Sequence, residues 1–155
     1  FRSLVEKETW LETERPDVAS VFLNRLRKHM RLQTDPSVIY GITLGQEKLD
    51  RPLSSKDLSA KTPYNTYQVD GLPAGPIANP GVEALEAVAH PSKTTFLYFV
   101  AKGPDPKDGH TFASTYAEHR KNVLKYRQAV AQDAAEQEKE DLEAQQAKDA
   151  GDTTQ

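Results

Sequence analysis

Apolar residues are concentrated in the first part of this 155-residue chain and become sparse after about Ala131. A folded body must therefore build its core from roughly 130 residues, the size of one ordinary domain. The segment from Gln132 to Gln155 has eight acidic and two basic side chains, so it carries a charge of −6 and the body carries +3. We expect one domain over residues 1–131 and an acidic low-complexity tail over 132–155. The tail is either a solvated helix or disordered, with disorder favoured beyond about Lys139.

The spacing of the apolar residues predicts several helices. Val18, Phe22, Leu26 and Met30 recur every four positions and form a core-facing stripe. Similar patterns and their Gly or Pro boundaries predict helices over residues 1–14, 16–30, 36–40, 55–60, 80–90 and from 115 onward. Short strands are expected at 66–69, 96–100 and 111–113, the last two pairing across a turn. The predicted fold class is α+β, with several helices around a small β-sheet.

Two capping boxes support the helix boundaries. Ser54 with Asp57, and Thr115 with Glu118, have the spacing in which each side chain bonds the other's backbone N–H. Between these boxes, residues 63–81 are rich in Pro, Gly and Asn, which favours a long ordered loop. The loop is therefore expected to be held by turns rather than by regular structure.

Several functional classes are excluded. No run approaches the roughly 20 apolar residues of a membrane span, and the absence of cysteine excludes disulfides, thiolate catalysis and Cys-ligated zinc. A Gly-rich phosphate loop, a nucleophile elbow and a paired-His zinc helix are also absent, and no spacing supports a metal. We therefore expect no cofactor and no metal. The chain lacks an initiating Met and opens on an apolar helix, which indicates a piece of a longer protein.

A basic cluster in the second predicted helix raises the question of nucleic acid binding. Arg25, Arg27, Lys28 and Arg31 lie close in sequence, but helical spacing distributes them over several faces. No aromatic residues alternate with them. A solvated face, with weak attraction to an anionic glycan, is favoured over a nucleic acid partner.

Two glutamates near the N terminus are candidates for acid–base chemistry. Glu6 and Glu8 lie about 200° apart around a helix axis, so both cannot point into one site. Glu6 shares its face with Thr9 and Trp10, and a carboxyl beside an indole can have its pKa raised toward that of a general acid. Glu8 shares a face with Leu11 and is equally compatible with the rim of a site. Helix geometry does not decide between them, and a solvated charge is the default for each.

The middle of the chain has the side chains of a sugar-binding groove. Groups suited to hydroxyls and acetamido groups, and aromatic faces suited to stacking, occur together there: Gln33, Thr34, Asp35, Asn65, Thr66, Asn79, Tyr40, Tyr64 and Tyr67. Asp35 and Asn79 each precede a proline and are better interpreted as helix N-caps. Gln33 and Thr34 lie between helices, where a groove role is favoured.

Other polar residues of this region leave the choice between groove and scaffold open. Asn65 and Tyr67 fit either role, because their loop has few apolar neighbours. His110 is a better site candidate than His90, which precedes a helix-stopping proline. Tyr98 and the residue after it are expected in the strand core.

Short motifs follow one another along most of the chain: Leu4-Val5-Glu6-Lys7-Glu8-Thr9, Val18-Ala19-Ser20-Val21-Phe22-Leu23-Asn24-Arg25-Leu26, Met30-Arg31-Leu32-Gln33-Thr34-Asp35-Pro36, Thr62-Pro63-Tyr64-Asn65-Thr66-Tyr67, Gly71-Leu72-Pro73-Ala74-Gly75-Pro76-Ile77, Asn79-Pro80-Gly81, Ala89-His90-Pro91, Tyr98-Phe99-Val100 and His110-Thr111-Phe112. In this series the chain resembles the MltG (YceG-like) endolytic murein transglycosylases. The resemblance covers residues 4–126. Chance similarity does not produce so many motifs in the same order.

The resemblance implies a role for each glutamate. In that family the first Glu of the Glu-Lys-Glu-Thr motif is the catalytic acid/base, which assigns the role to Glu6 and leaves Glu8 as a helper or structural residue. The implied reaction cleaves the bond between N-acetylmuramic acid and N-acetylglucosamine and closes the muramoyl C6 hydroxyl onto C1, giving a 1,6-anhydromuramoyl end. Because this nucleophile is tethered to the substrate, no second carboxylate is required.

The resemblance also implies partners and a location. The substrate is the glycan strand of peptidoglycan, and the full-length proteins are associated with peptidoglycan synthases and limit strand length. Family members carry a transmembrane helix and a LysM-like region before the catalytic motif, and almost nothing precedes Glu6 here. We therefore expect a catalytic region on the outer side of the cytoplasmic membrane, with the anchor absent from this chain.

Two other functions stay open. A muramidase would use water, with Asp35 or Glu8 as its second carboxylate. A non-catalytic glycan-binding module would bind the strand without making new ends.

Overall fold

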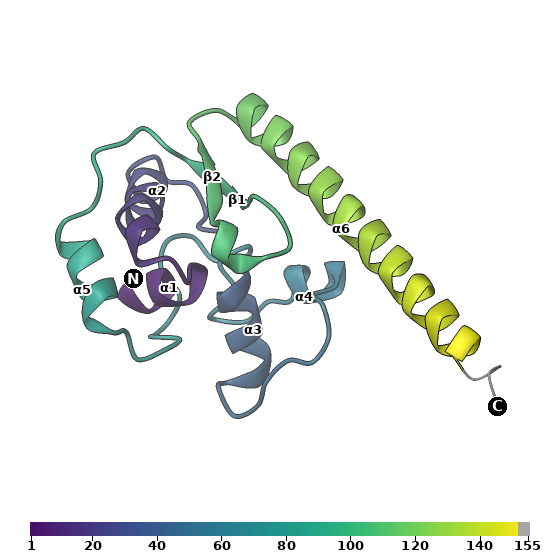
Figure 1. Ribbon diagram of the computed structural model, residues 1–155. Helices are drawn as coiled ribbons and strands as arrows, with labels where there is room; N and C mark the ends of the chain where they lie inside the picture. Colours follow the sequence, from purple (N-terminus) through teal and green to yellow (C-terminus); the bar gives the residue numbers. More distant parts are fainter. Residues whose placement is uncertain (152–155) are drawn as a thin grey trace.

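The computed structural model describes residues 1–151, with side chains described through Lys148. Figure 1 shows short helices and a two-stranded sheet gathered into one body, with a long helix running past the sheet and away from the body. The elements in chain order are α1 (Arg2–Glu8), the 3₁₀ helix η1 (Glu12–Glu14), α2 (Arg15–Arg27), α3 (Asp35–Thr43), α4 (Ser55–Ser59), α5 (Val82–Ala89), β1 (Tyr98–Ala101), the 3₁₀ helix η2 (Pro106–Asp108), β2 (His110–Ala113) and α6 (Tyr116–Gly151). The predicted α+β class is confirmed.

The hydrophobic core lies where α1, α2 and α5 pack together. From the predicted stripe of α2, Val18 and Phe22 are buried and Leu26 packs against the cluster. The helix has a proline in its first turn, where a missing N–H costs nothing. The central buried set consists of Leu4, Val5, Val18, Ala19, Phe22, Leu32, Ile77 and Ala87.

The first predicted helix is shorter than expected. It ends at Glu8 rather than continuing to about residue 14, because Thr9 has an extended backbone (φ −141°, ψ 140°). The Thr9 hydroxyl accepts a hydrogen bond from the Leu11 N–H at 3.1 Å and donates to Glu14 at 3.1 Å. A local side-chain bond of this kind competes with the helix for the backbone. The chain consequently turns directly after Glu8.

Two predicted N-caps are wrong by one or two positions. The N-cap of α3 is Thr34, and Asp35 is the first helical residue. The N-cap of α5 is Gly81, and Asn79 lies exposed two residues before it. Pro36 is consequently the second residue of α3 rather than the first, whereas Pro80 lies one residue before the cap of α5. Neither N-cap residue makes a side-chain cap hydrogen bond. Because Asp35 is not the N-cap of α3, its carboxylate is available to other partners.

The helix α3 also continues past the predicted stop at Gly41 and ends at Thr43, and its C-cap residue Leu44 adopts a left-handed backbone with φ 51°. Gly41 has a packing role instead. A Cβ at this position would collide with the hydroxyl of Thr62. The glycine therefore permits the 60–81 segment to lie directly on the helix.

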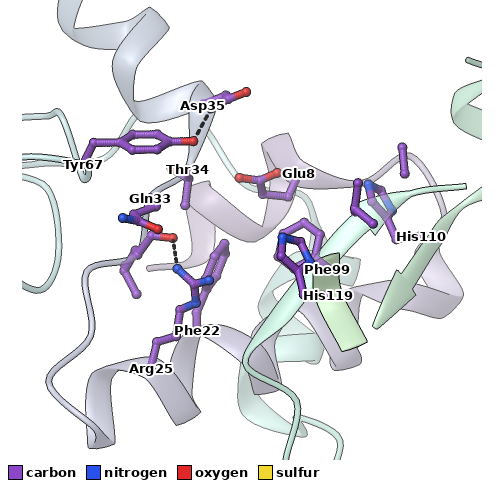
Figure 2. Close-up of a pocket in the computed structure, with 13 residues that line it drawn as sticks. Glu8, Phe22, Arg25, Gln33, Thr34, Asp35, Tyr67, Phe99, His110 and His119 are labelled. Carbon is purple, nitrogen blue, oxygen red and sulfur yellow. Dashed lines mark hydrogen bonds between the residues drawn. The ribbon is translucent and has the colours of Figure 1, made fainter. Parts of the chain in front are cut away.

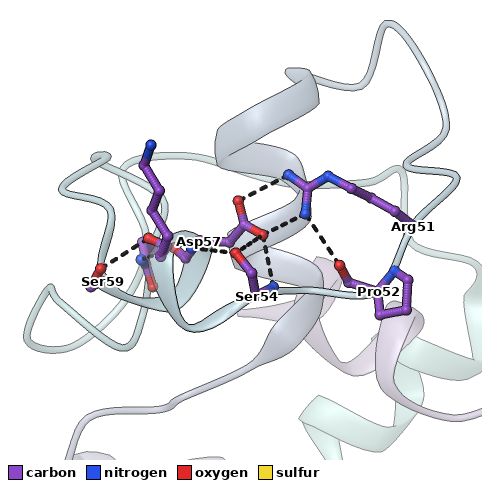
Figure 3. A network of polar contacts seen from close by, with 7 residues as sticks. Arg51, Pro52, Ser54, Asp57 and Ser59 are labelled. Atoms are coloured by element: carbon purple, nitrogen blue, oxygen red, sulfur yellow. Dashed lines mark hydrogen bonds and ion pairs between the residues drawn. The ribbon is translucent and has the colours of Figure 1, made fainter.

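Both predicted capping boxes are confirmed. In α4 the Ser54 hydroxyl accepts from the Asp57 N–H while the Asp57 carboxylate accepts from the Ser54 N–H (Figure 3). Arg51 donates two hydrogen bonds to the same carboxylate, at 2.6 and 3.0 Å. These donors from Arg51 and Ser54 hold the pKa of Asp57 well below its usual range. At α6, Thr115 and Glu118 make the equivalent reciprocal pair.

The segment between α4 and α5 is an ordered series of turns, and the strand predicted at 66–69 is absent from it. Asn65 and Thr66 are fully buried. Their side chains satisfy backbone groups of neighbouring segments, so the local chain needs no strand partner to satisfy its buried polar groups. The predicted ordered loop is confirmed, and hydrogen bonds from its buried polar side chains stabilise it.

The predicted hairpin is confirmed as an antiparallel pair in which Tyr98 faces Ala113 and Ala101 faces His110. The first half of α6 packs on this pair. Disorder beyond Lys139 was the wrong alternative, because α6 continues as a helix to Gly151; residues 152–155 lie outside the described part. Every residue from 131 to 148 is exposed, as the loss of apolar residues predicts. No described helix combines the length and apolar character required to cross a bilayer.

Candidate active site

A pocket of about 290 Å³ lies where the end of α1 meets α2, the 32–35 segment, the sheet and the start of α6 (Figure 2). Phe22, Leu32 and Phe99 form apolar walls. Its polar lining consists of Glu8, Arg25, Gln33, Thr34, Asp35, Tyr67, His110 and His119. The pocket therefore collects residues from seven parts of the chain. Five of these residues were predicted from the sequence to bind substrate: Gln33, Thr34, Asp35, Tyr67 and His110.

Glu8 occupies the centre of this lining, between Asp35 on one side and the two histidines on the other (Figure 2). It is the last residue of α1 and is partly buried. Among the described residues, none donates a hydrogen bond to its carboxyl or forms an ion pair with it. Burial raises the pKa of Glu8 to about 8, with a further increase from the Asp35 charge and an opposing effect of Arg25. The carboxyl is therefore protonated at neutral pH.

Glu6 does not line this pocket. It lies on the other side of α1, where its Oε2 accepts a hydrogen bond from the Gly81 N–H at 3.1 Å. Its Oε1 lies 3.7 Å from the guanidinium of Arg15, which lies 3.7 Å from Glu83 as well. Glu6 thus caps the N-terminal end of α5 and joins that helix to α1 and α2. Helix geometry predicted that only one glutamate could enter a site, and the pocket contains Glu8.

The sequence predicted a solvated face for the basic cluster, and for Arg25 this prediction is wrong. Unlike the exposed Arg27, it is buried, and its Nε donates to the Leu97 carbonyl at 2.6 Å. Its Nη1 donates to the carbonyls of Arg31 and Leu32 at 3.0 and 3.1 Å. The guanidinium also lies over the Tyr98 ring, 5.1 Å from its centroid. Arg25 therefore ties two walls of the pocket together and places a positive charge in it.

Asp35 and Tyr67 form a second polar pair. The Tyr67 hydroxyl donates to Asp35 Oδ1 at 2.7 Å (Figure 2). Burial raises the pKa of Tyr67, and the hydrogen bond and charge of Asp35 raise it further. The phenol therefore stays protonated and is the donor to Asp35. Beside them, Gln33 is exposed with a left-handed backbone (φ 53°).

Two histidines close the other end of the pocket. His110 is held by Glu14, which accepts from its backbone N–H at 2.7 Å and bonds its ring Nδ1 at 2.8 Å. His119 lies on α6 and stacks on Tyr98 with the ring centroids 5.0 Å apart. Its Nδ1 is buried and has no hydrogen-bond partner among the described residues, and burial lowers its pKa.

Four predicted substrate residues lie elsewhere. Asn65 donates to the carbonyls of Leu58 and Ala60 and accepts from the Tyr67 N–H, so it is a scaffold residue. Thr66 bonds the Thr34 N–H and Ser37, also inside the fold. Tyr64 packs edge-on against Tyr40, with centroids 4.8 Å apart. Asn79 is exposed near the start of α5.

The sequence reasoning missed three residues of this site. Arg25 had a detectable signal, because it lies three positions after Phe22, on the buried side of α2. Glu14 and His119 had none, because their partners come from segments about 100 and 20 residues away. Only the tertiary structure brings them to the pocket.

The arrangement can perform proton transfer on a polar, uncharged ligand. It offers the protonated carboxyl of Glu8, the second carboxyl group of Asp35 and imidazole nitrogens within apolar walls. Within the part of the chain that the structure describes, no group of three or more His, Asp or Glu side chains could hold a metal ion.

Comparisons with known proteins decide the family. A model of the YceG-like family matches residues 2–125. The chain belongs to the YceG-like family. The resemblance that the motifs predicted is thereby confirmed.

Relatives in this family agree with the assignment. An endolytic murein transglycosylase of Bacillus subtilis (strain 168) is 49% identical over 125 residues, covering 80% of this chain and 32% of that protein. The one from Streptococcus pneumoniae serotype 2 (strain D39 / NCTC 7466) is 35% identical over 130 residues, covering 80% of this chain and 22% of that protein. The crystal structure of a yceG-like protein from Listeria monocytogenes is 45% identical with a TM-score of 0.66, covering 77% of this chain and 36% of that one. The chain therefore spans between 22% and 36% of the length of these relatives.

Proposed function

We propose that this chain is the catalytic part of an endolytic peptidoglycan lytic transglycosylase, acting at the cell wall. It cleaves the β-1,4 bond between N-acetylmuramic acid and N-acetylglucosamine. The family and the names of its relatives support the activity. The single observation that carries the mechanism is Glu8, a pocket carboxyl with no hydrogen-bond or ion-pair partner among the described residues and a pKa of about 8, which can donate a proton at neutral pH.

In the proposed reaction, Glu8 protonates the bridging glycosidic oxygen as the bond to the muramoyl C1 breaks. The resulting carboxylate then takes the proton of the muramoyl C6 hydroxyl while that oxygen bonds to C1. Glu8 ends protonated, the leaving sugar carries a new hydroxyl, and the other product is a 1,6-anhydromuramoyl end. Because the nucleophile belongs to the substrate, proximity replaces the activation of water.

This proposal moves the acid from Glu6 to Glu8. The motif resemblance assigned Glu6, and that assignment stays a prediction. Two features support Glu8: it lines the pocket, whereas Glu6 accepts from the Gly81 N–H and neighbours Arg15. These contacts engage the Glu6 carboxyl within the fold, away from the pocket.

A muramidase is the second candidate, and one observation favours it. Asp35 lines the same pocket as Glu8 and accepts a hydrogen bond from the Tyr67 hydroxyl. An ionised carboxylate opposite a protonated one is the pair that water-using glycosidases employ. The two reactions differ in their product, because hydrolysis adds the elements of water to the new end.

Within the pocket, Gln33, Thr34, Asp35, Tyr67 and His110 are the proposed sugar contacts. Tyr64, Asn65, Thr66 and Asn79, which the sequence also nominated, support the fold around them or lie outside the pocket. Anchoring to the cytoplasmic membrane, the limiting of strand length and association with peptidoglycan synthases are proposals for the longer protein.

The test is mass spectrometry of uncrosslinked glycan strands incubated with this chain and with a form extended at its N terminus. Anhydro ends that disappear in Glu8→Gln and persist in Glu6→Gln are the expected result. Loss in Glu6→Gln with activity in Glu8→Gln would return the role to Glu6. Hydrated ends would establish a muramidase, and binding without new ends from either form would indicate a glycan-binding module.

A further inference from the structure

We propose that Glu14 is a positioning residue that fixes the ring of His110 with a proton on Nδ1, so that Nε2 of the neutral imidazole accepts a hydrogen bond from a sugar hydroxyl in the pocket. The identity of the ligand rests on the proposed function. The place of the ring proton on Nδ1 rests on the contacts of Glu14.

The first observation is the set of bonds around the Glu14 carboxylate. Its Oε1 accepts from the His110 backbone N–H at 2.7 Å, and its Oε2 lies 2.8 Å from His110 Nδ1. The Thr9 hydroxyl donates to Oε2 at 3.1 Å. One carboxylate therefore grips both the backbone and the ring of the same histidine, while Thr9 ties it to the turn that follows Glu8.

The second observation is that the backbone is shaped for this contact. Gly109, directly before His110, has φ +75°, and a Cβ there would collide with the Glu14 carboxylate. Glycine is the residue that satisfies both requirements. The side chains of His110 and Glu14 are only 16% and 14% exposed. The ring also makes an edge contact with Phe99, at 5.4 Å and 85°.

These contacts determine which ring nitrogen of His110 carries the proton when the ring is neutral. Burial raises the pKa of Glu14, but the hydrogen bonds from the His110 backbone and ring and from Thr9 outweigh it and leave the pKa lowered. An ionised carboxylate only accepts, so Nδ1 must be the donor. In a neutral imidazole the other nitrogen is then an acceptor. Nε2 is the polar atom of His110 that no hydrogen bond among the described residues uses, and the ring lines the pocket (Figure 2).

The chemistry of the ligand follows from the lining. A neutral acceptor selects a donor, and hydroxyl groups are the most frequent donors on a glycan strand. Glu8, in its protonated form, donates to the sugar, and His110 would accept from it. Glu8 at the centre of the pocket and His110 at one end thus have complementary hydrogen-bonding roles, which favours one orientation of the bound sugar.

The first test is long-range ¹H–¹⁵N NMR of the histidine rings at a pH where they are neutral. His110 is expected as the Nδ1–H tautomer, whereas the exposed His29 and His90 serve as controls for rings without a carboxylate contact in the described structure. In Glu14→Gln the amide would donate to Nδ1 and reverse the tautomer to Nε2–H. An Nε2–H tautomer in the unmodified protein, or no change in Glu14→Gln, would overturn the proposal. This measurement does not depend on glycan cleavage.

The second test uses a matched pair of variants. The His110→Asn amide can still donate to Glu14 but does not reach the pocket, whereas the His110→Gln amide oxygen extends to about the place of Nε2. His110→Asn is expected to lower kcat/KM about tenfold or more while His110→Gln retains most of it. Equal losses in both would contradict the acceptor role. Adding uncrosslinked glycan to Glu8→Gln should also shift the Nε2 resonance of His110, and a shift confined to other residues would count against it.

Discussion

The two faces of α1 carry the same side chain in opposite surroundings. On one face, Glu6 receives the Gly81 N–H and lies beside Arg15. On the other face, Glu8 lies in the pocket without a hydrogen-bond partner among the described residues, and its pKa is raised to about 8. Donors stabilise the charge of a carboxyl and make it a structural group. Their absence leaves a protonated carboxyl that is available to a ligand.

The difference arises from what packs on each face. The N-terminal end of α5 lies against the Glu6 face. The N–H of Gly81 there has no acceptor within the helix and donates to the Glu6 carboxylate. The Glu8 face is left open by the turn at Thr9. The same helix therefore packs against α2 and α5 in the core and also forms one wall of the site.

The substitution Glu8→Gln gives the largest expected effect on this comparison. Loss of the proton donor should lower the rate of glycan cleavage by about 10²- to 10⁴-fold, measured as new strand ends by mass spectrometry. The fold should be unaffected, because the carboxyl makes no hydrogen bond or ion pair to other described residues. Glu12→Gln, at an exposed glutamate of η1, is the matched control and should retain full activity. Undiminished cleavage by Glu8→Gln would show that Glu8 is not the proton donor.

The pH dependence sharpens the same contrast. Cleavage should be maximal below about pH 8 and fall about tenfold per pH unit above it, because the acid form of Glu8 is required. A pKa raised from the ordinary 4.5 means that the folded state binds more protons, so the free energy of unfolding should decrease as pH rises between 4.5 and 8. Urea titrations across this range should show a weaker dependence in Glu8→Gln. Identical slopes in the two proteins would indicate an unperturbed Glu8.

A smaller effect is expected from Glu6→Gln, and on stability rather than activity. The amide can still accept from the Gly81 N–H but no longer pairs with Arg15, which is buried. The free energy of unfolding should fall by about 1–2 kcal/mol, measured by urea denaturation. The folded variant should keep most of its cleavage. A variant of full stability with no activity would reverse the roles of the two faces.

Removal of residues 132–155 should have the smallest effect. Residues 131–148 are all exposed, so the end of α6 packs on neither face of α1. The shortened chain should differ by less than about 0.5 kcal/mol in unfolding free energy and retain its activity. Circular dichroism should report a loss of helix without a change in the denaturation midpoint. A large destabilisation would show that the end of α6 supports the body.

The sequence predicted much of the fold correctly because the relevant signals are local. Apolar spacing located α2 and the hairpin, and two capping boxes located the starts of α4 and α6. The failures involved competing local bonds. The hydroxyl of Thr9 ended α1 early, and the prolines after Asp35 and Asn79 did not make those residues caps.

The candidate site was only partly predictable. Polar residue types identified Gln33, Asp35, Tyr67 and His110, which do line the pocket. The same criterion selected Asn65, which is fully buried and satisfied by backbone groups. Composition cannot distinguish a polar side chain that faces a ligand from one that supports a loop, because both must form hydrogen bonds.

By itself, the sequence determined the family, the α+β class and the fact that Glu6 and Glu8 must face opposite ways, since a helix turns about 100° per residue. Only the tertiary structure decided which of the two enters the pocket. That choice depends on α5 and on the sheet, whose residues lie about 75 to 105 positions away from α1. The pKa of a carboxyl is set by its burial and its neighbours, and those are defined only once the chain has folded.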